Sequence, residues 1–392
     1  MRISYLLTHP IQYQSPLIRS LVEGGIEIHV AYATDTTSRA FHDVEFGRSV
    51  TWDVPLLEGY SHTLLNRDAP TGTASGLRRL YADQIRSHLQ EHPADAIWVH
   101  GWSHPFTLAA WDVAAETRKP LMLRGETFLG CIKGGHLRRL AHRWVYSKRF
   151  RRASAFLAVG TLNHQLYLAY GAPENRIFSV PYAVDNAFFQ EAASQAKGGR
   201  ELLRTSLGIE PGRPIVLFCG KLIPKKDPAT LIRALSQLKK GPQSPVLVVV
   251  GDGELRSPLE ALAEEVLPES TRFLGFKNQT ELPAFYDLCD VFVIPSLFEP
   301  WGLVVNEVMN AGKPVIVSDQ VGSGPDLVQP GINGDVFKAG DAADLAQKLT
   351  PYCSDPEFCQ EAGRRSLARI QSWSFEECLT GMKQALAHLS RR

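Results

Sequence analysis

The sequence lacks any apolar run long enough to cross a membrane, because none of its hydrophobic stretches approaches the roughly 20 residues that a bilayer span requires. It also lacks a Cys-x-x-Cys pair among its six cysteines, several of which lie within apolar segments. This pattern predicts reduced thiols in a cytoplasmic protein and indicates no zinc site. The amino-terminal MRISYLLTHP is too short an apolar run for a signal peptide, so we expect none.

The chain has no excess of either charge. Lysine and arginine together number 42 and aspartate and glutamate 41, which leaves a formal net charge of +1. Without a strong net field there is no global attraction for nucleic acid, so we expect no nucleic-acid partner. No fixed-period repeat or low-complexity segment interrupts the 392 residues, a length that allows two domains with separate cores.

Short β-rich runs alternate with helical patterns along the chain. The first half contains RISYLL, IEIHVAYA, AIWVH, PLMLR, AFLAV and IFSVP, and the second half contains PIVLFCG, VLVVVGDG, RFLGF, VFVIP and PVIVSD. Continuous hydrophobic strands between helices are typical of parallel sheets that helices cover on both faces. The sequence therefore predicts an α/β protein with two doubly wound, Rossmann-like domains.

The periodicity fades between these two series, at VDNAFFQEAASQAKGGR (184–200). We place one domain at residues 1–187 and the other at 188–372. The remaining residues, 373–392, are expected to form a helix with Leu379, Met382, Ala385 and Leu386 on one side. Such an apolar side requires a surface to pack on.

Four loops of the second half follow strands and lead toward helices, which is where open α/β sheets bind ligands. They are CGKLIPKKDPAT, GDGELRSP, GFKNQTELP and SLFEPWGLVVNEVMNAGKPVI. The first brings Lys221, Lys225 and Lys226 near a helix start, as a phosphate site requires. In the last, Gly302 lets backbone N–H groups approach an anion. Any one loop is compatible with an ordinary turn, but the four in order favour a binding site.

The fourth loop also carries two carboxylates, Glu299 and Glu307, among apolar and small residues. A buried carboxylate without a partner costs several kcal/mol, so each requires a role. Pro300 and Gly302 indicate that the helix begins only after them. We therefore expect Glu299 on a loop and Glu307 inside the helix, about one turn from its start.

The succession of LFCGKLIPKKDPATLIRAL, VVGDGELRSPLEALA, RFLGF, the Glu299-x7-Glu307 element and GSGPDLVQPGINGDVF resembles the donor domain of a family 4 retaining glycosyltransferase of the GT-B fold. The resemblance is strong over residues 214–338 and weaker in the first half, where RRASAFLAVG and YAVDNAFF carry it. It implies an acceptor side in residues 1–187 and a nucleotide-sugar site in 188–372. It also implies that residues 373–392 cross back onto the first domain.

The resemblance implies particular roles on the donor side. Glu307 would accept hydrogen bonds from ribose hydroxyls, and Glu299 would lie beside hydroxyls of the transferred sugar. Lys221 and Lys226 would contact the leaving phosphates, although most relatives carry Arg at the first position and Lys lacks its bidentate fork. The other donor-binding candidates are backbone or base contacts at Gly220, Gly251, Phe276, Lys277, Gly302, Leu303 and Val304.

The reaction implied is transfer of a sugar from a nucleoside diphosphate to an acceptor hydroxyl with the anomeric configuration kept. Lysines aimed at the diphosphate would stabilise the negative charge that gathers there in the transition state. No DxD cluster of metal-dependent sugar transferases is present. We expect neither a metal ion nor another cofactor. The sugar, the base and the acceptor stay open, and the acceptor could be a glycan, a lipid-linked precursor or a small molecule.

The first half departs from the family pattern. Many relatives carry a His where this chain has Glu126, in LMLRGETF. Glu126 is a candidate for orienting a hydroxyl or assisting its deprotonation, and an ion pair with Arg124 is the structural alternative. His100 and His104 follow the strand AIWV, and this loop with Trp102 is a candidate wall of the acceptor pocket. Local hydrogen bonding is the alternative for both histidines.

The segment HLRRLAHRWVYSKRFRRAS, residues 136–154, has helical spacing of Leu137, Leu140, Ala141, Trp144 and Val145 beside seven positive charges. A basic amphipathic helix of this kind can lie on an anionic membrane. The alternative is a helix packed on the sheet with a solvated basic face. Peripheral contact with the inner face of the membrane would favour a lipid-linked acceptor.

Two other functions are compatible with the fold. A sugar-nucleotide epimerase would require acid and base groups that the sequence does not indicate. A non-catalytic nucleotide-sugar-binding partner subunit would have no need of both glutamates and the basic pair. We therefore predict a metal-independent glycosyltransferase of glycan biosynthesis, with Glu299, Lys226, Lys221, Glu126 and His100 as catalytic candidates.

Overall fold

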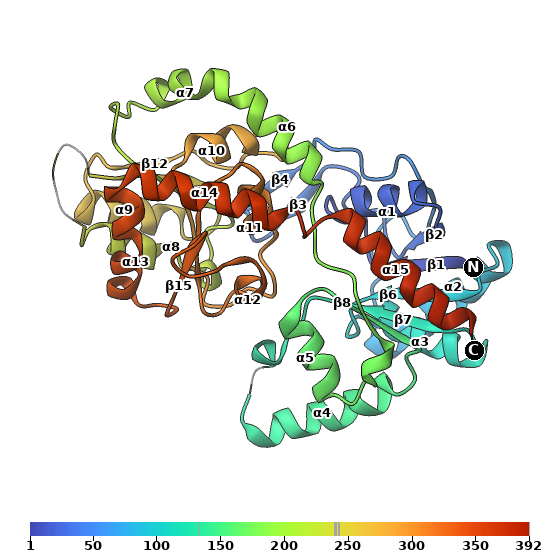
Figure 1. The fold of residues 1–392 in the computed structure, drawn as a ribbon. Coiled ribbons are helices and arrows are strands. Elements are labelled where there is room, and N and C mark those ends of the chain that lie inside the picture. Colours follow the sequence, from blue (N-terminus) through green and yellow to red (C-terminus); the bar gives the residue numbers. More distant parts are fainter. Residues whose placement is uncertain (133, 239–240, 242–243, 392) are drawn as a thin grey trace. The chain divides into compact units, whose positions relative to one another are not determined.

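The structure is a computed structural model that describes residues 1–132, 134–238, 241 and 244–391. The chain divides into two compact units (Figure 1). Unit 1 comprises Met1–Phe41, Val54–Val184 and Ser374–Arg392. Unit 2 comprises His42–Asp53 and Asp185–Trp373.

Unit 1 is a parallel sheet of seven strands in the order β5-β2-β1-β6-β7-β8-β9. Its strands are β1 (Arg2–Leu7), β2 (Glu27–Tyr32), β5 (Ser61–Leu64), β6 (Ala96–His100), β7 (Leu121–Arg124), β8 (Ala155–Ala158) and β9 (Ile177–Ser179). Its helices are α1 (Gln14–Glu23), α2 (Ala74–Glu91), α3 (Pro105–Glu116), η1 (Leu129–Cys131), α4 (His136–Phe150), α5 (Thr161–Ala169), η2 (Glu174–Arg176) and α15 (Phe375–Ser390).

The core of unit 1 follows from the continuous apolar strands at the centre of the sheet. The side chains of β6, β7 and β8 are almost all fully buried, because helices cover both faces. Tyr5 on β1 lies opposite Trp98 on β6, and their rings stack 3.5 Å apart. Phe106, Phe150 and Phe156 extend this core toward α3, α4 and β8.

Unit 2 is a parallel sheet of six strands in the order β12-β11-β10-β13-β14-β15. Its strands are β10 (Ile215–Cys219), β11 (Val246–Val250), β12 (Thr271–Phe273), β13 (Val291–Ile294), β14 (Val315–Ser318) and β15 (Gly334–Phe337). Its helices are α6 (Asn186–Ala196), η3 (Lys197–Gly199), α7 (Arg200–Ser206), η4 (Pro224–Lys226), α8 (Pro228–Leu235), α9 (Arg256–Val266), α10 (Leu282–Leu288), α11 (Leu303–Asn310), α12 (Gly324–Leu327), α13 (Ala342–Ser354) and α14 (Pro356–Ile370).

The strand order of unit 2 reverses between β10 and β13, the arrangement of a dinucleotide-binding sheet. The five residues of β11 are all buried, as expected for a strand covered on both faces. All eleven predicted strands are present, and the prediction of two parallel α/β domains is confirmed. The short strands β5 and β15 escaped prediction because neither forms a continuous apolar run.

One stretch of the first half is grouped differently from the prediction. Residues 42–53, which carry β4 (Arg48–Val50) and most of β3 (Phe41–Asp43), belong to unit 2 rather than to the domain predicted at 1–187. The reason is local: their carboxylates pair with lysines after β10, and the ring of Phe46 lies 5.0 Å from that of Phe276. The main boundary lies at 184/185, three residues before the predicted one.

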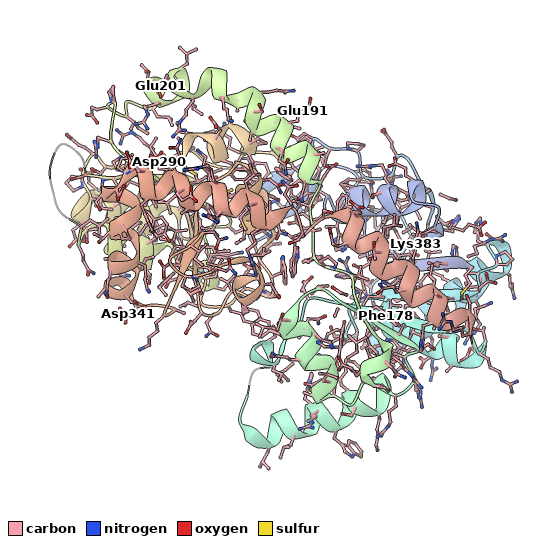
Figure 2. All side chains as sticks on the ribbon, viewed as in Figure 1. Phe178, Glu191, Glu201, Asp290, Asp341 and Lys383 are labelled. Carbon is pink, nitrogen blue, oxygen red and sulfur yellow. The ribbon has the colours of Figure 1, made fainter. Side chains whose placement is uncertain are left out.

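Helix α15 packs on unit 1 (Figure 1). It contacts α1, β8 and β9, and the buried residues Cys378, Met382 and Ala385 face that surface. Figure 2 labels Phe178 of β9 and Lys383 of α15 on these neighbouring elements. A Cβ added at Gly381 would lie only 1.7 Å from the carbonyl oxygen of Ser179, so this helix requires glycine where it crosses β9.

Candidate active site

The reversal of strand order in unit 2 brings together the loops that follow β10 and β13. In sheets of this kind, the crevice beyond the carboxyl ends of those two strands is the ligand site. The loops are joined directly, because the N–H of Leu297 donates to the carbonyl oxygen of Lys225 over 2.9 Å. Lys226 and Glu299, predicted from separate motifs, are therefore neighbours.

Lys226 and Glu299 form an ion pair between Nζ and Oε2. Their side chains are only 19% and 14% exposed, so water screens the pair weakly. Glu299 lies on a loop, as predicted, and its backbone is fixed by hydrogen bonds to Gln320 and Gly322. The pair places a cation and an anion side by side at the carboxyl edge of the sheet.

Glycines hold the surrounding backbone at close range. Gly251 has φ +137°, and a Cβ there would lie 1.9 Å from the carbonyl oxygen of Gly220. The loops after β10 and β11 are thus in backbone contact, as the hydrogen bond from Leu222 N–H to the carbonyl oxygen of Asp252 also shows. Gly302 has φ +89° and directly precedes α11. A left-handed residue at this point is what opens the amino end of that helix.

Glu307 lies inside α11 and is buried, as predicted. The hydroxyl of Tyr286 on α10 donates to its Oε2 over 2.5 Å. Burial raises the pKa of Glu307 to about 7, and the hydrogen bond from Tyr286 opposes that rise only in part. A carboxyl group with this pKa changes charge near neutral pH. Sequence reasoning missed Tyr286, whose place on a different helix gave no local signal.

Lys221 and Lys225 have partners that the sequence did not indicate. Nζ of Lys221 lies 3.0 Å from Oδ2 of Asp43 and 2.8 Å from Oε2 of Glu45, and Nζ of Lys225 lies 3.0 Å from Oε1 of Glu45. Hydrogen bonds from both lysines lower the pKa of Glu45 to about 2. The β3–β4 segment, residues 42–53, thus sets two carboxylates against the basic loop.

The same segment covers the predicted base-side residues. Phe46 meets Phe276 edge to face, and the guanidinium of Arg48 lies 5.0 Å from the centre of the Phe276 ring. Lys277 pairs with Glu281 over 3.1 Å. The β3–β4 segment therefore contacts both the lysine loop and the loop that follows β12.

The candidates of the first half lie in unit 1, at its own point of strand reversal between β1 and β6. His100 ends β6, and its Nε2 lies 3.5 Å from Oε2 of Glu126. Burial opposes ionisation of Glu126, but hydrogen bonds with His100 and Tyr182 and the charge of Arg124 hold its pKa below the usual range. Glu126 is therefore a carboxylate at neutral pH.

The structural alternative for Glu126, an ion pair with Arg124, is wrong: the contacts of the described residues include no such pair. Arg124 is fully buried and donates to the carbonyl oxygens of Val180 and Pro181. His104 caps α3 by accepting the N–H of Phe106, which is the local role weighed for it. Trp102 is 6% exposed and belongs to the core, so it is not a wall of an open pocket.

Helix α4 packs on the core of unit 1 through Phe150 and Tyr146, while the apolar side identified from the sequence is exposed. Leu137 and Trp144 are 82% and 63% exposed, and Leu140 and Val145 are exposed as well. Nζ of Lys148 lies 3.3 Å from the centre of the Trp144 ring. The side chains of Arg138 and Arg139, which contribute to the predicted basic face, lie outside the described ones. Across the described residues, no helix has the length and apolar character of a membrane span.

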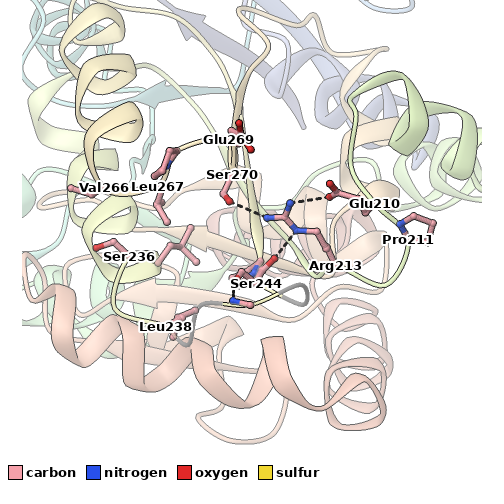
Figure 3. Close-up of a pocket in the computed structure, with 14 residues that line it drawn as sticks. Glu210, Pro211, Arg213, Ser236, Leu238, Ser244, Val266, Leu267, Glu269 and Ser270 are labelled. Atoms are coloured by element: carbon pink, nitrogen blue, oxygen red, sulfur yellow. Dashed lines mark hydrogen bonds and ion pairs between the residues drawn. The ribbon is translucent and has the colours of Figure 1, made fainter.

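A pocket of unit 2 lies at the opposite edge of the sheet, before β10, β11 and β12 (Figure 3). Arg213 points across it and donates to Glu210, to the carbonyl oxygen of Ser244 and to Ser270. Because this pocket opens at the amino ends of the strands, it is separate from the candidate active site.

Two units of this topology, with two glutamates and a group of lysines after the strands of the second, are typical of the GT-B class of sugar transferases. Residues 199–369 match the family described as glycosyl transferases group 1, and residues 10–183 match the glycosyl transferase 4-like domain. Together these matches span most of the chain. The chain belongs to the family 4 glycosyltransferases.

Named relatives agree with this assignment. The chain is 25% identical over 389 residues to a D-inositol 3-phosphate glycosyltransferase of Nocardia farcinica, covering 92% of this chain and 84% of the relative. It is 27% identical to an alpha-D-kanosaminyltransferase of Streptomyces kanamyceticus over 221 residues, 55% of each chain. Among solved structures, HepE of Anabaena in complex with UDP has a TM-score of 0.75 at 19% identity, covering 99% of this chain and 100% of HepE. WaaG, a glycosyltransferase involved in lipopolysaccharide biosynthesis, has a TM-score of 0.68 at 18% identity and 98% coverage of both chains.

Proposed function

We propose that the protein transfers a sugar from a nucleoside diphosphate to an acceptor hydroxyl with retention of the anomeric configuration. The observation that carries the proposal is the arrangement at the carboxyl edge of unit 2. There, Lys226 and Glu299 pair beside the glycine that opens α11, and Glu307 lies within that helix. This set offers a cation and free helix N–H groups for a diphosphate and two separate carboxylates for sugar hydroxyls.

The ion pair of Lys226 and Glu299 suits an exchange of partners. When a donor enters, its diphosphate would take the place of Glu299 at Lys226, and hydroxyls of the transferred sugar would take the place of Lys226 at Glu299. Charge that gathers on the leaving diphosphate is then met by Lys226 and by the amino end of α11. These groups supply the charge that a divalent metal would otherwise bring, so the proposed reaction requires no metal.

Glu307 is proposed to accept the ribose hydroxyls. The relevant state is the carboxylate, because only the charged form accepts at both oxygens. Uridine diphosphate is the first nucleotide to test, since HepE has this fold and was crystallised with UDP. Lys221 and Lys225 are proposed to bind the diphosphate after Asp43 and Glu45 release them.

Unit 1 is proposed to hold the acceptor. His100 and Glu126 lie at its strand reversal, where a carboxylate oriented by an imidazole can hold or deprotonate a hydroxyl. The exposed apolar stripe and basic side of α4 favour an acceptor at an anionic membrane surface. On this proposal the acceptor is lipid-linked and the protein is peripheral.

A donor screen followed by a transfer assay tests the function. Thermal shift with nucleoside diphosphates and their sugars identifies the donor, because a ligand at 100 times its dissociation constant stabilises a fold by about 2.7 kcal/mol. Release of the nucleoside diphosphate is then measured with and without candidate acceptors, and NMR of the product gives the anomeric configuration. Stabilisation by a donor without release on any acceptor would favour a binding subunit, and inversion would contradict the proposed stereochemistry.

Flotation with vesicles containing anionic lipid tests the membrane site. Reversing Arg149, Arg151 and Arg152 to Glu should abolish binding. Reversing Arg364 and Arg365 on α14, which are 70% and 63% exposed, is the matched control. Unchanged flotation after the first set of reversals, or equal loss after the control, would contradict the proposed contact.

A further inference from the structure

Three histidines of unit 1 meet in a cluster that includes none of the residues assigned above to sugar transfer. His88 lies near the end of α2, His92 directly follows that helix, and His29 lies on β2. One ligand nitrogen of each lies within 4.8 Å of the other two. The ring centroids form a triangle of 3.9 Å between His29 and His92, 5.2 Å between His29 and His88, and 5.1 Å between His88 and His92.

The local fold explains why the rings converge. His88 and His92 are four residues apart, and the N–H of His92 donates to the carbonyl oxygen of His88 over 2.8 Å, which continues the helical turn. Side chains at this spacing lie on one face of a helix. His29 lies on β2, which stands between β5 and β1 in the sheet. Its ring contacts the rings of His88 and His92 at the end of α2.

Hydroxyl groups contact all three rings, and the contact of His92, between its Nε2 and Oγ1 of Thr63, is the longest at 3.5 Å. Ser61 lies 2.8 Å from Nδ1 of His29, and Thr63 lies 2.9 Å from Nε2 of the same ring. Ser4 lies 3.2 Å from Nε2 of His88. Outer partners of this kind fix the orientation of metal-binding imidazoles, and a hydroxyl can turn to donate or accept as the ligand state requires.

The cluster carries an unexplained polar group. His88 is 2% exposed, and its Nδ1 has no hydrogen-bond partner among the described residues. A buried nitrogen without a partner is a position that an added ligand, such as a metal ion, would satisfy.

We propose that His29, His88 and His92 form a binding site for a divalent transition-metal ion of the zinc class. Three imidazoles with a fourth position left to water are a known zinc ligand set, with Zn–N distances near 2.0–2.1 Å. In a tetrahedral site the nitrogens lie about 3.4 Å apart, so the half-buried rings of His29 and His92 would turn inward on binding. The cysteine pattern gave no sign of this site, because its ligands are histidines. His29 on the strand precedes His88 on the helix by 59 positions, so no short motif marks the site.

A bound ion would tie the carboxyl end of α2 to β2. Its expected effect is on the stability of unit 1 and not on the chemistry of sugar transfer, because the ligands are separate from the proposed transfer residues. A ligand that binds only the folded state raises the melting temperature according to its free concentration and dissociation constant.

The test uses untagged full-length protein, stripped with a chelator and titrated with ZnCl2 by calorimetry near pH 7.5. Co²⁺ serves as the spectroscopic probe, because its visible absorption reports tetrahedral coordination. We expect one equivalent of Zn²⁺ to bind, the melting temperature to rise, and Co²⁺ to give tetrahedral absorption bands that Zn²⁺ removes. His29→Gln and His92→Gln should each weaken binding at least ten-fold.

Two controls keep the result interpretable. His62→Gln alters a histidine of β5 outside the cluster and should bind Zn²⁺ as the unaltered protein does. The half-buried His29 and His92 are altered in place of the fully buried His88, so that melting of the metal-free variants can verify that they fold. Absence of saturable binding, or binding that survives in both His29→Gln and His92→Gln, would overturn the proposal and leave a hydrogen-bonded histidine cluster.

Discussion

Neutralising the two carboxylates of the β3–β4 segment is expected to strengthen the binding of a nucleoside diphosphate. Asp43 and Glu45 pair with Lys221 and Lys225 through three ion pairs of 2.8–3.0 Å. A diphosphate that uses these lysines must first displace the carboxylates. In the variant Asp43→Asn with Glu45→Gln, that competition is removed while the shapes of the side chains are kept.

The magnitude follows from the exposure of the groups. Glu45 and Lys225 are 46% and 47% exposed, so solvent screening reduces their pair to about 0.5 kcal/mol. Lys221 and Asp43 are less exposed, at 25% and 16%, so we assign their pair about 1 kcal/mol. Because the double variant has no such pairs to break when the diphosphate binds, we expect a net gain of about 1–2 kcal/mol in the free energy of binding. Affinity should therefore rise about 5- to 30-fold at low salt.

Calorimetric titration of UDP at low and at high salt measures the effect. The gain should shrink as salt rises, because the Debye length falls to about 8 Å at physiological ionic strength. Asp53→Asn is the matched control. Asp53 lies in the same segment but accepts the N–H of Thr280, and among the described residues it forms no ion pair with Lys221 or Lys225. An unchanged or weaker affinity in the double variant, or an equal gain in Asp53→Asn, would refute competition by charge.

Four further outcomes are expected. Lys226→Ala should lower turnover about 100-fold with little change in melting temperature, whereas Lys225→Ala should lower it far less; near-normal turnover would contradict the phosphate role. Because the pKa of Glu307 is raised to about 7, its protonated form stabilises the ligand-free fold fully below about pH 4.5, and this contribution is lost as the pH rises through 7. The affinity for UDP should rise over roughly the same interval up to pH 8. Glu307→Gln should bind UDP at least about ten-fold more weakly. Its affinity should also depend less on pH, with only the titration of the phosphate near pH 6 remaining. Glu299→Ala should lose turnover without losing affinity for UDP, since it frees Lys226; equal loss of affinity in both glutamate variants would contradict their separate roles. Chelation with EDTA should leave turnover intact, and loss that Mg²⁺ or Mn²⁺ restores would show that the transfer requires a metal.

The parts of the site that could be predicted are those whose secondary structure depends only on neighbouring residues. Glu299 and Glu307 are eight positions apart, and Pro300 and Gly302 between them fix where the helix begins, so their placement on loop and helix was readable. The apolar runs likewise predicted eleven strands that the structure contains, because burial of a strand under helices leaves a continuous apolar signal.

The missed parts depend on contacts between distant segments. Tyr286 meets Glu307 from another helix, and Glu45 meets Lys221 across 176 positions of sequence. The sequence left two readings of α4 open for a related reason: helical spacing identifies an apolar face, but not whether another element covers it.

Helix α15 has a consequence for dissecting the protein. Because residues 374–392 complete unit 1 while residues 185–373 form most of unit 2, no single cut of the chain yields both units intact. A fragment ending at residue 184 would expose the strand backbone that Gly381 covers and the surface under Met382 and Ala385. Isolated unit 1 would require its last helix to be supplied in trans or rejoined by a linker. Loss of α15, which lies far along the chain from the acceptor candidates, would therefore weaken the unit that carries them.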